Sequence, residues 1–182
     1  PHARRAATRL GVAPEVLVAQ SALETGWGRH VMRDAEGRSS HNMFGIKATG
    51  GWQGKQVRVS TLEYRDGIAQ RELAAFRGYP DPGASFADYA RLVGEHPRYR
   101  EALANADSPE GYLRALQDAG YATDPAYADK ILSILERGLP GLAAPVSSDG
   151  ALNSAAPRPI TPQTGDPGIA RVRPPAAGEE TS

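Results

Sequence analysis

Apolar and polar residues alternate with helical spacing in two stretches near the start of the chain. The stretch His2–Leu10 is typical of a helix that ends at Gly11. Pro14 suits the first turn of a second helix, which runs to about Thr25. Glycine is the residue that most readily adopts the left-handed backbone that closes a helix, so the next residue, Gly26, fits its end.

The second predicted helix carries an acidic residue beside its apolar stripe. The stripe consists of Val16, Ala19, Leu23 and Trp27, and the row beside it of Leu17, Gln20 and Glu24. This spacing places Glu24 at the edge of the buried face.

The pattern changes between Asn42 and Tyr79, where glycines and β-branched residues replace the helical spacing. Strict alternation, as in Gln56–Ser60, predicts two or three short antiparallel strands with a turn at Arg65-Asp66-Gly67. We expect a small β insert here.

Helical patterns return after the insert. Ser85 and Asp88 have the spacing of a capping box, and Ser108-Pro109 predicts the start of a helix that runs through Gln117. A last helix follows Asp124-Pro125, with its apolar residues at Tyr127, Ile131, Ile134 and Leu135. The order predicted is helices, a β insert, then helices.

Composition divides the 182 residues into a domain, 1–140, and a tail, 141–182. The tail is rich in Pro, Ala, Gly and Ser and cannot bury enough apolar surface to offset chain entropy, so we expect disorder there. With 21 Lys and Arg against 21 Asp and Glu, the chain has no broad charge for nucleic acid or an anionic membrane. It shows no membrane span and no signal peptide, and its start at Pro1 suggests an excised piece.

Histidine and cysteine offer no chemistry. The chain has no Cys, and its four His lack metal-binding spacing, so we predict neither a metal site nor a cofactor.

Glu24 is the first candidate for catalysis. Partial burial beside Leu23 and Trp27, and the negative end of the helix dipole, are both expected to raise its pKa. A carboxyl that is protonated near neutral pH can serve as a general acid. The alternative is a structural ion pair with Arg29 or Arg33.

Two further residues could complete a site. A glycosidase normally needs a second carboxylate across the cleft. Glu63 lies beside the predicted turn, where strand alternation points it away from Leu62 and Tyr64, although a surface ion pair with Arg58 or Arg65 would also explain it. Tyr121 precedes the last helix and could donate a hydrogen bond to substrate, or simply pack in the core.

Several aromatic residues could stack on sugar rings, with the core as the alternative for each. They are Trp27, Phe44, Trp52, Tyr64 and Tyr79.

Seven segments in order resemble glycoside hydrolase family 73, the peptidoglycan-hydrolase domain of flagellar rod-assembly proteins. They are AQSALETGWG (19–28), HNMFGIK (41–47), TLEYRDG (61–67), FRGYPD (76–81), SFADYARLV (85–93), HPRYREAL (96–103) and LQDAGYATDPAYADKI (116–131). The likeness covers nearly all of residues 2–139.

The resemblance implies a lysozyme-like α+β fold, in which a helical lobe and a small β-hairpin lobe flank a cleft. It implies an endo-β-N-acetylglucosaminidase that cleaves peptidoglycan strands, with Glu24 as proton donor, Glu63 as the second carboxylate and Tyr121 beside them. Asn42 and Phe44 correspond to the segment that floors the cleft.

The same fold leaves two alternatives for function. One is a muramidase or lytic transglycosylase, and the other is a wall-binding module without activity. The resemblance also implies a periplasmic location and flagellar rod proteins as partners through an N-terminal segment that is missing here.

Overall fold

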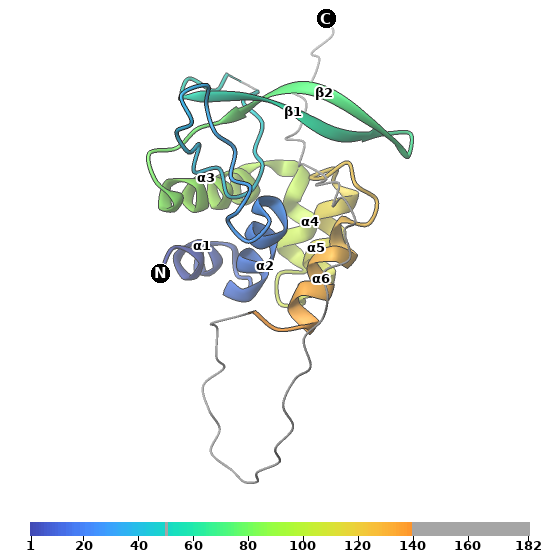
Figure 1. Ribbon diagram of the computed structural model, residues 1–182. Helices are drawn as coiled ribbons and strands as arrows, with labels where there is room; N and C mark the ends of the chain where they lie inside the picture. Colours follow the sequence, from blue (N-terminus) through green and yellow to red (C-terminus); the bar gives the residue numbers. More distant parts are fainter. Residues whose placement is uncertain (50, 140–182) are drawn as a thin grey trace, which may run out of the picture.

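The computed structural model describes residues 1–49 and 51–139, and these residues form a helical lobe with a long β-hairpin laid across it (Figure 1). The helices are α1 (His2–Leu10), α2 (Pro14–Thr25), α3 (Pro82–Glu95), α4 (Arg100–Ala104), α5 (Pro109–Asp118) and α6 (Tyr127–Glu136), with a 3₁₀ turn, η1, at Pro97–Tyr99. The strands are β1 (Gln56–Arg65) and β2 (Ile68–Arg77). The predicted tail, 141–182, lies outside the described residues.

The first two helices confirm the prediction from glycine and proline positions. Gly11 and Gly26 both take the left-handed conformation, with φ of 75° and 54°. At the end of α2, the Trp27 N–H donates to the Ala22 carbonyl at 2.8 Å, which closes the helix as a Schellman motif does.

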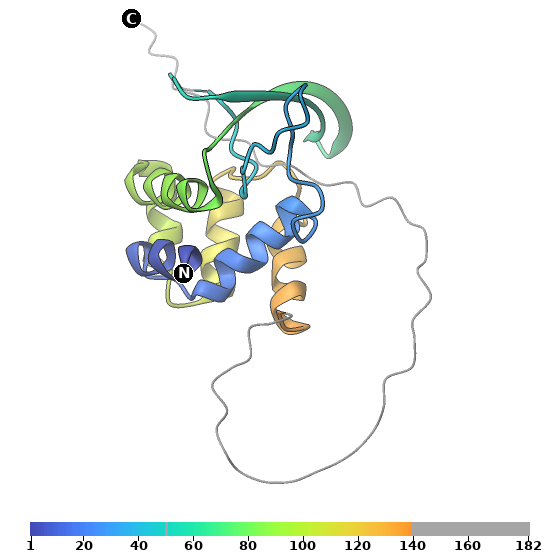
Figure 2. The same cartoon turned by 60° about the vertical axis from the view of Figure 1, so that its left-hand side comes forward.

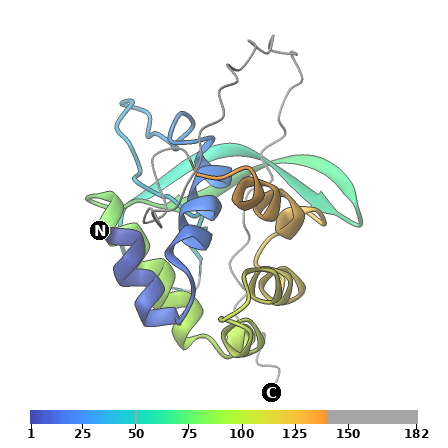
Figure 3. The ribbon, with the colours of Figure 1, turned by 90° about the horizontal axis from the view of Figure 1, so that it is seen from below.

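α2 is the central helix of the lobe. It packs between α1 and α6, as the view from below shows (Figure 3), while α1 also packs on α3, and α5 packs on α4 and α6. The predicted stripe of α2 is partly wrong: Trp27 lies beyond the helix end and is 45% exposed. Val16 and Ala19 of the stripe are buried as predicted, and the adjoining row of Leu17, Gln20 and Glu24 is buried as well. No helix among the described residues is long and apolar enough to cross a membrane.

The β insert is longer than predicted. Its two strands have ten residues each and pair antiparallel from Gln56 opposite Arg77 to Arg65 opposite Ile68. The turn is the predicted one, since Asp66 and Gly67 have φ of 50° and 75°. In place of a third strand, the loop before the hairpin makes an isolated bridge between Lys47 and Phe76.

The predicted capping box of α3 is wrong. Asp81 caps the helix by accepting from the Ala84 N–H at 2.9 Å, and Pro82 occupies the first helical position. Ser85 and Asp88 therefore lie within the helix, where both are buried. By contrast, Ser108 caps α5 as predicted, because its hydroxyl accepts from the Gly111 N–H.

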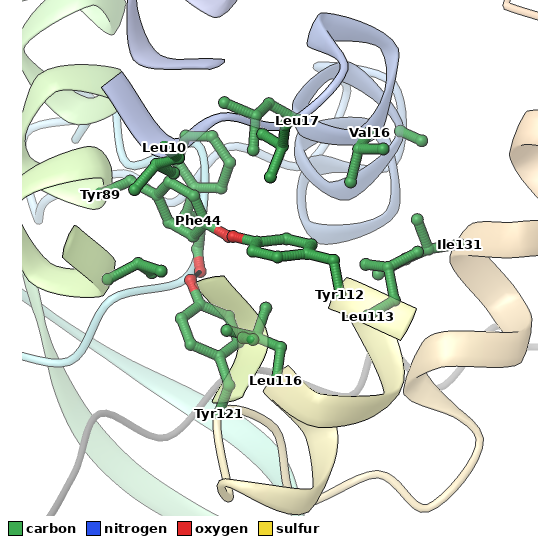
Figure 4. Packing of buried hydrophobic residues seen from close by; sticks show 14 of the residues in the cluster. Leu10, Val16, Leu17, Phe44, Tyr89, Tyr112, Leu113, Leu116, Tyr121 and Ile131 are labelled. Carbon is green, nitrogen blue, oxygen red and sulfur yellow. Dashed lines mark hydrogen bonds between the residues drawn. The ribbon is translucent and has the colours of Figure 1, made fainter. Parts of the chain in front are cut away.

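The main core lies inside the helical lobe, beneath the hairpin (Figure 2). Phe44, from the loop before the hairpin, enters this core and stacks on Tyr89 at 4.1 Å between ring centroids (Figure 4). A smaller cluster of Met32, Val57 and Phe76 joins the hairpin to the loop. The loop thus connects the two lobes through apolar contacts on both sides.

Candidate active site

Glu24 lies in the last turn of α2, on the buried side of the helix. Its side chain is 5% exposed, and both carboxylate oxygens are shielded from solvent. The next residue, Thr25, fixes the end of the helix: its hydroxyl donates to the Ser21 carbonyl at 2.6 Å and accepts from the Gly28 N–H at 2.9 Å. The position of Glu24 is therefore set by a tightly bonded helix end.

Two tyrosines from the C-terminal part of the domain lie within electrostatic reach of Glu24. Burial first, and then the negative charge of Glu24, raise the pKa of Tyr127 well above its ordinary value of 10.0. Burial also raises the pKa of Tyr121, with smaller contributions from other tyrosines and from Glu24. Both phenols therefore stay protonated near neutral pH.

A buried polar network lies one turn before Glu24. The Gln20 amide donates to the Tyr127 hydroxyl at 3.0 Å and accepts from the Tyr89 hydroxyl at 2.9 Å. The Tyr89 and Tyr112 hydroxyls are 2.7 Å apart. This network joins α2, α3, α5 and α6, and it fixes the rotation of α2 that points Glu24 inward.

Glu63 lies on the inner face of β1 and is 2% exposed. Strand alternation predicted that Glu63 points to the face opposite Leu62 and Tyr64. The structure agrees, because Glu63 is buried while Leu62 and Tyr64 are only partly buried. Its Oε1 pairs with the Lys47 ammonium at 2.7 Å, and its Oε2 accepts from the Thr123 hydroxyl at 2.9 Å. The sequence offered Arg58 or Arg65 as partners, but Arg65 pairs with Glu72 instead.

The segment 121–127 runs past both carboxylates. Thr123 holds Glu63 and also accepts from the Tyr64 N–H at 3.2 Å, while Tyr121 and Tyr127 lie within electrostatic reach of Glu24. The structure thus brings the two predicted acids to one segment, although they come from opposite lobes.

Besides the two carboxylates, three predicted site residues lie beneath the surface. Tyr121 is fully buried and donates its hydroxyl to the Phe44 carbonyl at 3.2 Å. The ring of Phe44 is also fully buried, among Tyr89 and its neighbours (Figure 4). The Asn42 amide group donates to the Ile46 and Arg77 carbonyls, each at 2.9 Å. These side chains support the loop that joins the lobes, and their predicted contact with sugar stays a prediction.

Trp27, Trp52 and Tyr64 reach the surface, as a sugar platform must. Trp27 is 45% exposed, three residues after Glu24, with a left-handed φ of 60° that a non-glycine residue rarely adopts. Tyr64 lines a small cavity of about 110 Å³ together with Glu63, Lys47 and Thr123.

Trp52 lies between two larger cavities of about 560 and 760 Å³ at the base of the hairpin. Its ring packs against the Arg77 guanidinium, 4.7 Å from the ring centroid, and against Tyr79. Arg77 and Tyr79 both donate to the buried Asp88 carboxylate, at 2.8 and 2.7 Å. The indole is therefore held rigidly at the edge of two hollows large enough for sugar rings.

Sequence reasoning missed three residues of this site: Gln20, Lys47 and Thr123. Each carried a signal. Gln20 occupies the same helical row as Glu24, Lys47 is a cation after the apolar run Phe44–Ile46, and Thr123 was considered only as a helix cap. Among the described residues, no group of three or more acidic residues or histidines is placed to hold a metal.

The chain is similar to several known proteins. The family model of the glucosaminidases, described as mannosyl-glycoprotein endo-beta-N-acetylglucosaminidase, matches residues 1–138. Peptidoglycan hydrolase FlgJ of Vibrio parahaemolyticus is 48% identical over 137 residues, covering 75% of this chain and 44% of that protein. FlgJ of Pseudomonas aeruginosa is 49% identical over 134 residues, covering 74% and 34%. The chain thus spans less than half the length of these curated relatives.

A solved structure shares the arrangement. The chain is similar to a mutant of the peptidoglycan hydrolase from Sphingomonas sp. A1, with a TM-score of 0.69 and 47% identity, over 72% of this chain and 84% of that one. The α+β prediction is therefore confirmed both by the elements and by a solved relative.

Proposed function

Because the chain belongs to the glucosaminidase family of glycoside hydrolases, we propose that it cleaves the glycan strands of peptidoglycan after N-acetylglucosamine. The observation that supports this proposal is the pair of buried carboxylates, Glu24 at the end of α2 and Glu63 on β1, which come from opposite lobes. Glycosidic bonds are usually hydrolysed by two carboxyl groups on opposite sides of the bond.

Glu24 is assigned the part of general acid. It delivers a proton to the glycosidic oxygen as the bond to C1 of N-acetylglucosamine breaks. Shielding of both carboxylate oxygens supports this part, because burial disfavours the charged form of a carboxyl group. The neutral phenols of Tyr121 and Tyr127 add polarity beside it without adding charge.

Glu63 is assigned the part of the ionised partner. An ion pair with Lys47 is made by the carboxylate, which accepts protons and cannot donate one. It either activates a water molecule, which inverts the configuration at C1, or stabilises the positive charge while the acetamido group of the substrate attacks C1. The anomer formed first, read by proton NMR of the fresh product, distinguishes the two routes.

Product analysis tests the proposal. Purified peptidoglycan is digested, the new ends are reduced, and the fragments are read by mass spectrometry. New reducing ends at N-acetylglucosamine support the proposal. Ends at N-acetylmuramic acid would make the chain a muramidase, anhydro ends a lytic transglycosylase, and the absence of any product a wall-binding module.

The variant E24Q tests the acid. We expect activity to fall by about 10²–10⁴-fold, the usual contribution of a general acid. E15Q is the matched control, since Glu15 lies exposed in the first turn of the same helix. Loss of activity in both variants would point to damage to α2 and not to a chemical part for Glu24.

The periplasmic location and the flagellar rod partners stay predictions. They concern the whole relatives, of which the chain spans less than half.

A further inference from the structure

We infer that Lys47 is a positioning residue that holds the Glu63 carboxylate in place for the reaction; the inference rests on the proposed function. The Lys47 ammonium lies 2.7 Å from Glu63 Oε1 and 3.1 Å from Glu72 Oε1. It therefore joins a carboxylate on each strand of the hairpin.

The backbone fixes Lys47 before its side chain makes any contact. Lys47 is bridged to Phe76, and the residues on either side of it bond to β2: the Arg77 N–H donates to the Ile46 carbonyl at 2.9 Å, and the Ala48 N–H donates to the Ala75 carbonyl at 2.8 Å. The lysine thus starts from a rigid edge of the hairpin. Only its side chain has to be ordered to reach Glu63.

The Lys47 side chain is 11% exposed and that of Glu63 is 2% exposed, so the pair is shielded from water and salt. A charge in such a place requires a partner, because an unpaired buried carboxylate is strongly disfavoured. Thr123 satisfies the second oxygen of Glu63 but brings no charge. Among the ion pairs of the described residues, Lys47 is the cation assigned to Glu63.

Glu72 competes for the same ammonium, but a second cation balances it. The Arg65 guanidinium donates to Glu72 Oε2 at 2.7 Å. Hydrogen bonds from Arg65 and then Lys47 hold the pKa of Glu72 below its ordinary value. Glu63, Lys47, Glu72 and Arg65 therefore form a series of alternating charges that runs from the buried side of β1 toward the surface, and Lys47 is left to orient Glu63.

The test is a double-variant cycle of K47M and E63Q, measured on soluble peptidoglycan fragments. We expect K47M to lower kcat by about tenfold or more with KM changed less than about twofold, because Lys47 acts through a catalytic group and not through substrate. In the E63Q background, K47M should cause no further fall in kcat. K47R, which keeps the charge, should recover most of the activity.

R9M is the matched control. This variant removes the ion pair between Arg9 and Glu95, which has the same length of 2.7 Å. Both of its side chains are exposed, and neither contacts Glu63 in that pair. We expect wild-type kinetics from R9M.

Three results would overturn the inference: K47M with wild-type kcat, K47M with an equal effect in the presence and absence of E63Q, or K47R as weak as K47M. If K47M alone does not fold, K47Q is measured in its place with Glu63 intact, and the same expected and contradicting results apply to it. A wild-type protein that releases no product would instead refute the proposed function.

Discussion

Asn42 offers the sharpest test of whether a predicted substrate contact is a structural residue. Its amide group donates to the Ile46 and Arg77 carbonyls at 2.9 Å each, and its Oδ1 accepts from the Ile46 N–H at 3.0 Å. Asn42 is 1% exposed. We expect N42A to destabilise the fold strongly, because it removes these three bonds inside the protein.

The magnitude follows from the bonds. Each is worth about 1 kcal/mol net, and the buried Ile46 N–H, left without this acceptor, adds about 1–2 kcal/mol, so the free energy of unfolding should fall by roughly 3–5 kcal/mol. At about 0.05–0.15 kcal/mol per residue, the domain has roughly 7–20 kcal/mol to lose, so N42A still folds. With a urea dependence of about 2 kcal/mol/M, the unfolding midpoint falls by about 2 M.

Urea unfolding followed by circular dichroism measures this loss. N105A is the matched control: Asn105 also donates to a backbone carbonyl, that of Glu101 at 2.8 Å, but in an exposed place, and its loss should cost less than about 1 kcal/mol. If N42A kept the wild-type midpoint and lost activity, the structural reasoning would be refuted and direct contact with substrate favoured.

Three further outcomes follow from the same contacts. Burial raises the pKa of Asp88, but hydrogen bonds from two arginines and a tyrosine outweigh it and hold that pKa below its ordinary value of 3.8. The ionised Asp88 therefore stabilises the fold above pH 3.8, and this stabilisation is lost as pH falls through the lower pKa of the folded state. Calorimetry from pH 6 downward should show a weaker fall in melting temperature for D88N than for wild type. A Cβ at Gly26 would lie 2.5 Å from the His30 ring, whereas one at Gly28 meets nothing within 4 Å, so G28A should cost about 1 kcal/mol from its positive φ alone and G26A clearly more; equal costs would show that His30 moves aside freely. Burial raises the pKa of Tyr121 and its buried neighbours well above 10.0, so stability should fall as pH rises above 10, and phenolate absorbance should appear together with unfolding and not before it.

Glycine, proline and turn residues in the sequence were enough to predict the ends of most helices and the hairpin turn. Gly11, Pro14 and Gly26 set the ends of α1 and α2, and the pair Asp66-Gly67 set the hairpin turn, because each conformation depends on the residue itself. The start of α3 was predicted wrongly because the capping-box spacing of Ser85 and Asp88 was preferred to the local signal of Asp81 and Pro82. Asp81 is the residue that caps the helix, and Pro82 occupies its first position, so α3 begins before Ser85.

The candidate site was predictable only in part. The helical row of Glu24 indicates partial burial, and strand alternation separates Glu63 from Leu62 and Tyr64, since both depend on local periodicity. That Glu63 is buried did not follow from the sequence. The partners of Glu63 do not follow from periodicity, because Lys47 and Thr123 are separated from it by other elements and meet it only in the fold. For Asn42 and Phe44, the family motif identified residues that matter but could not separate support from contact.

The two carboxylates that are proposed as general acid and ionised partner have different neighbours. Glu24 faces protonated phenols and an apolar lobe, whereas Glu63 faces an ammonium and a hydroxyl. The two carboxyl groups therefore have different surroundings, as the proposed parts of general acid and ionised partner require. The phenols come from the helical lobe and the ammonium from the hairpin edge, so each lobe supplies the polar neighbours of its own carboxyl group. The segment 121–127 then has only to hold the lobes in register, which Thr123 does by bonding to both Glu63 and Tyr64.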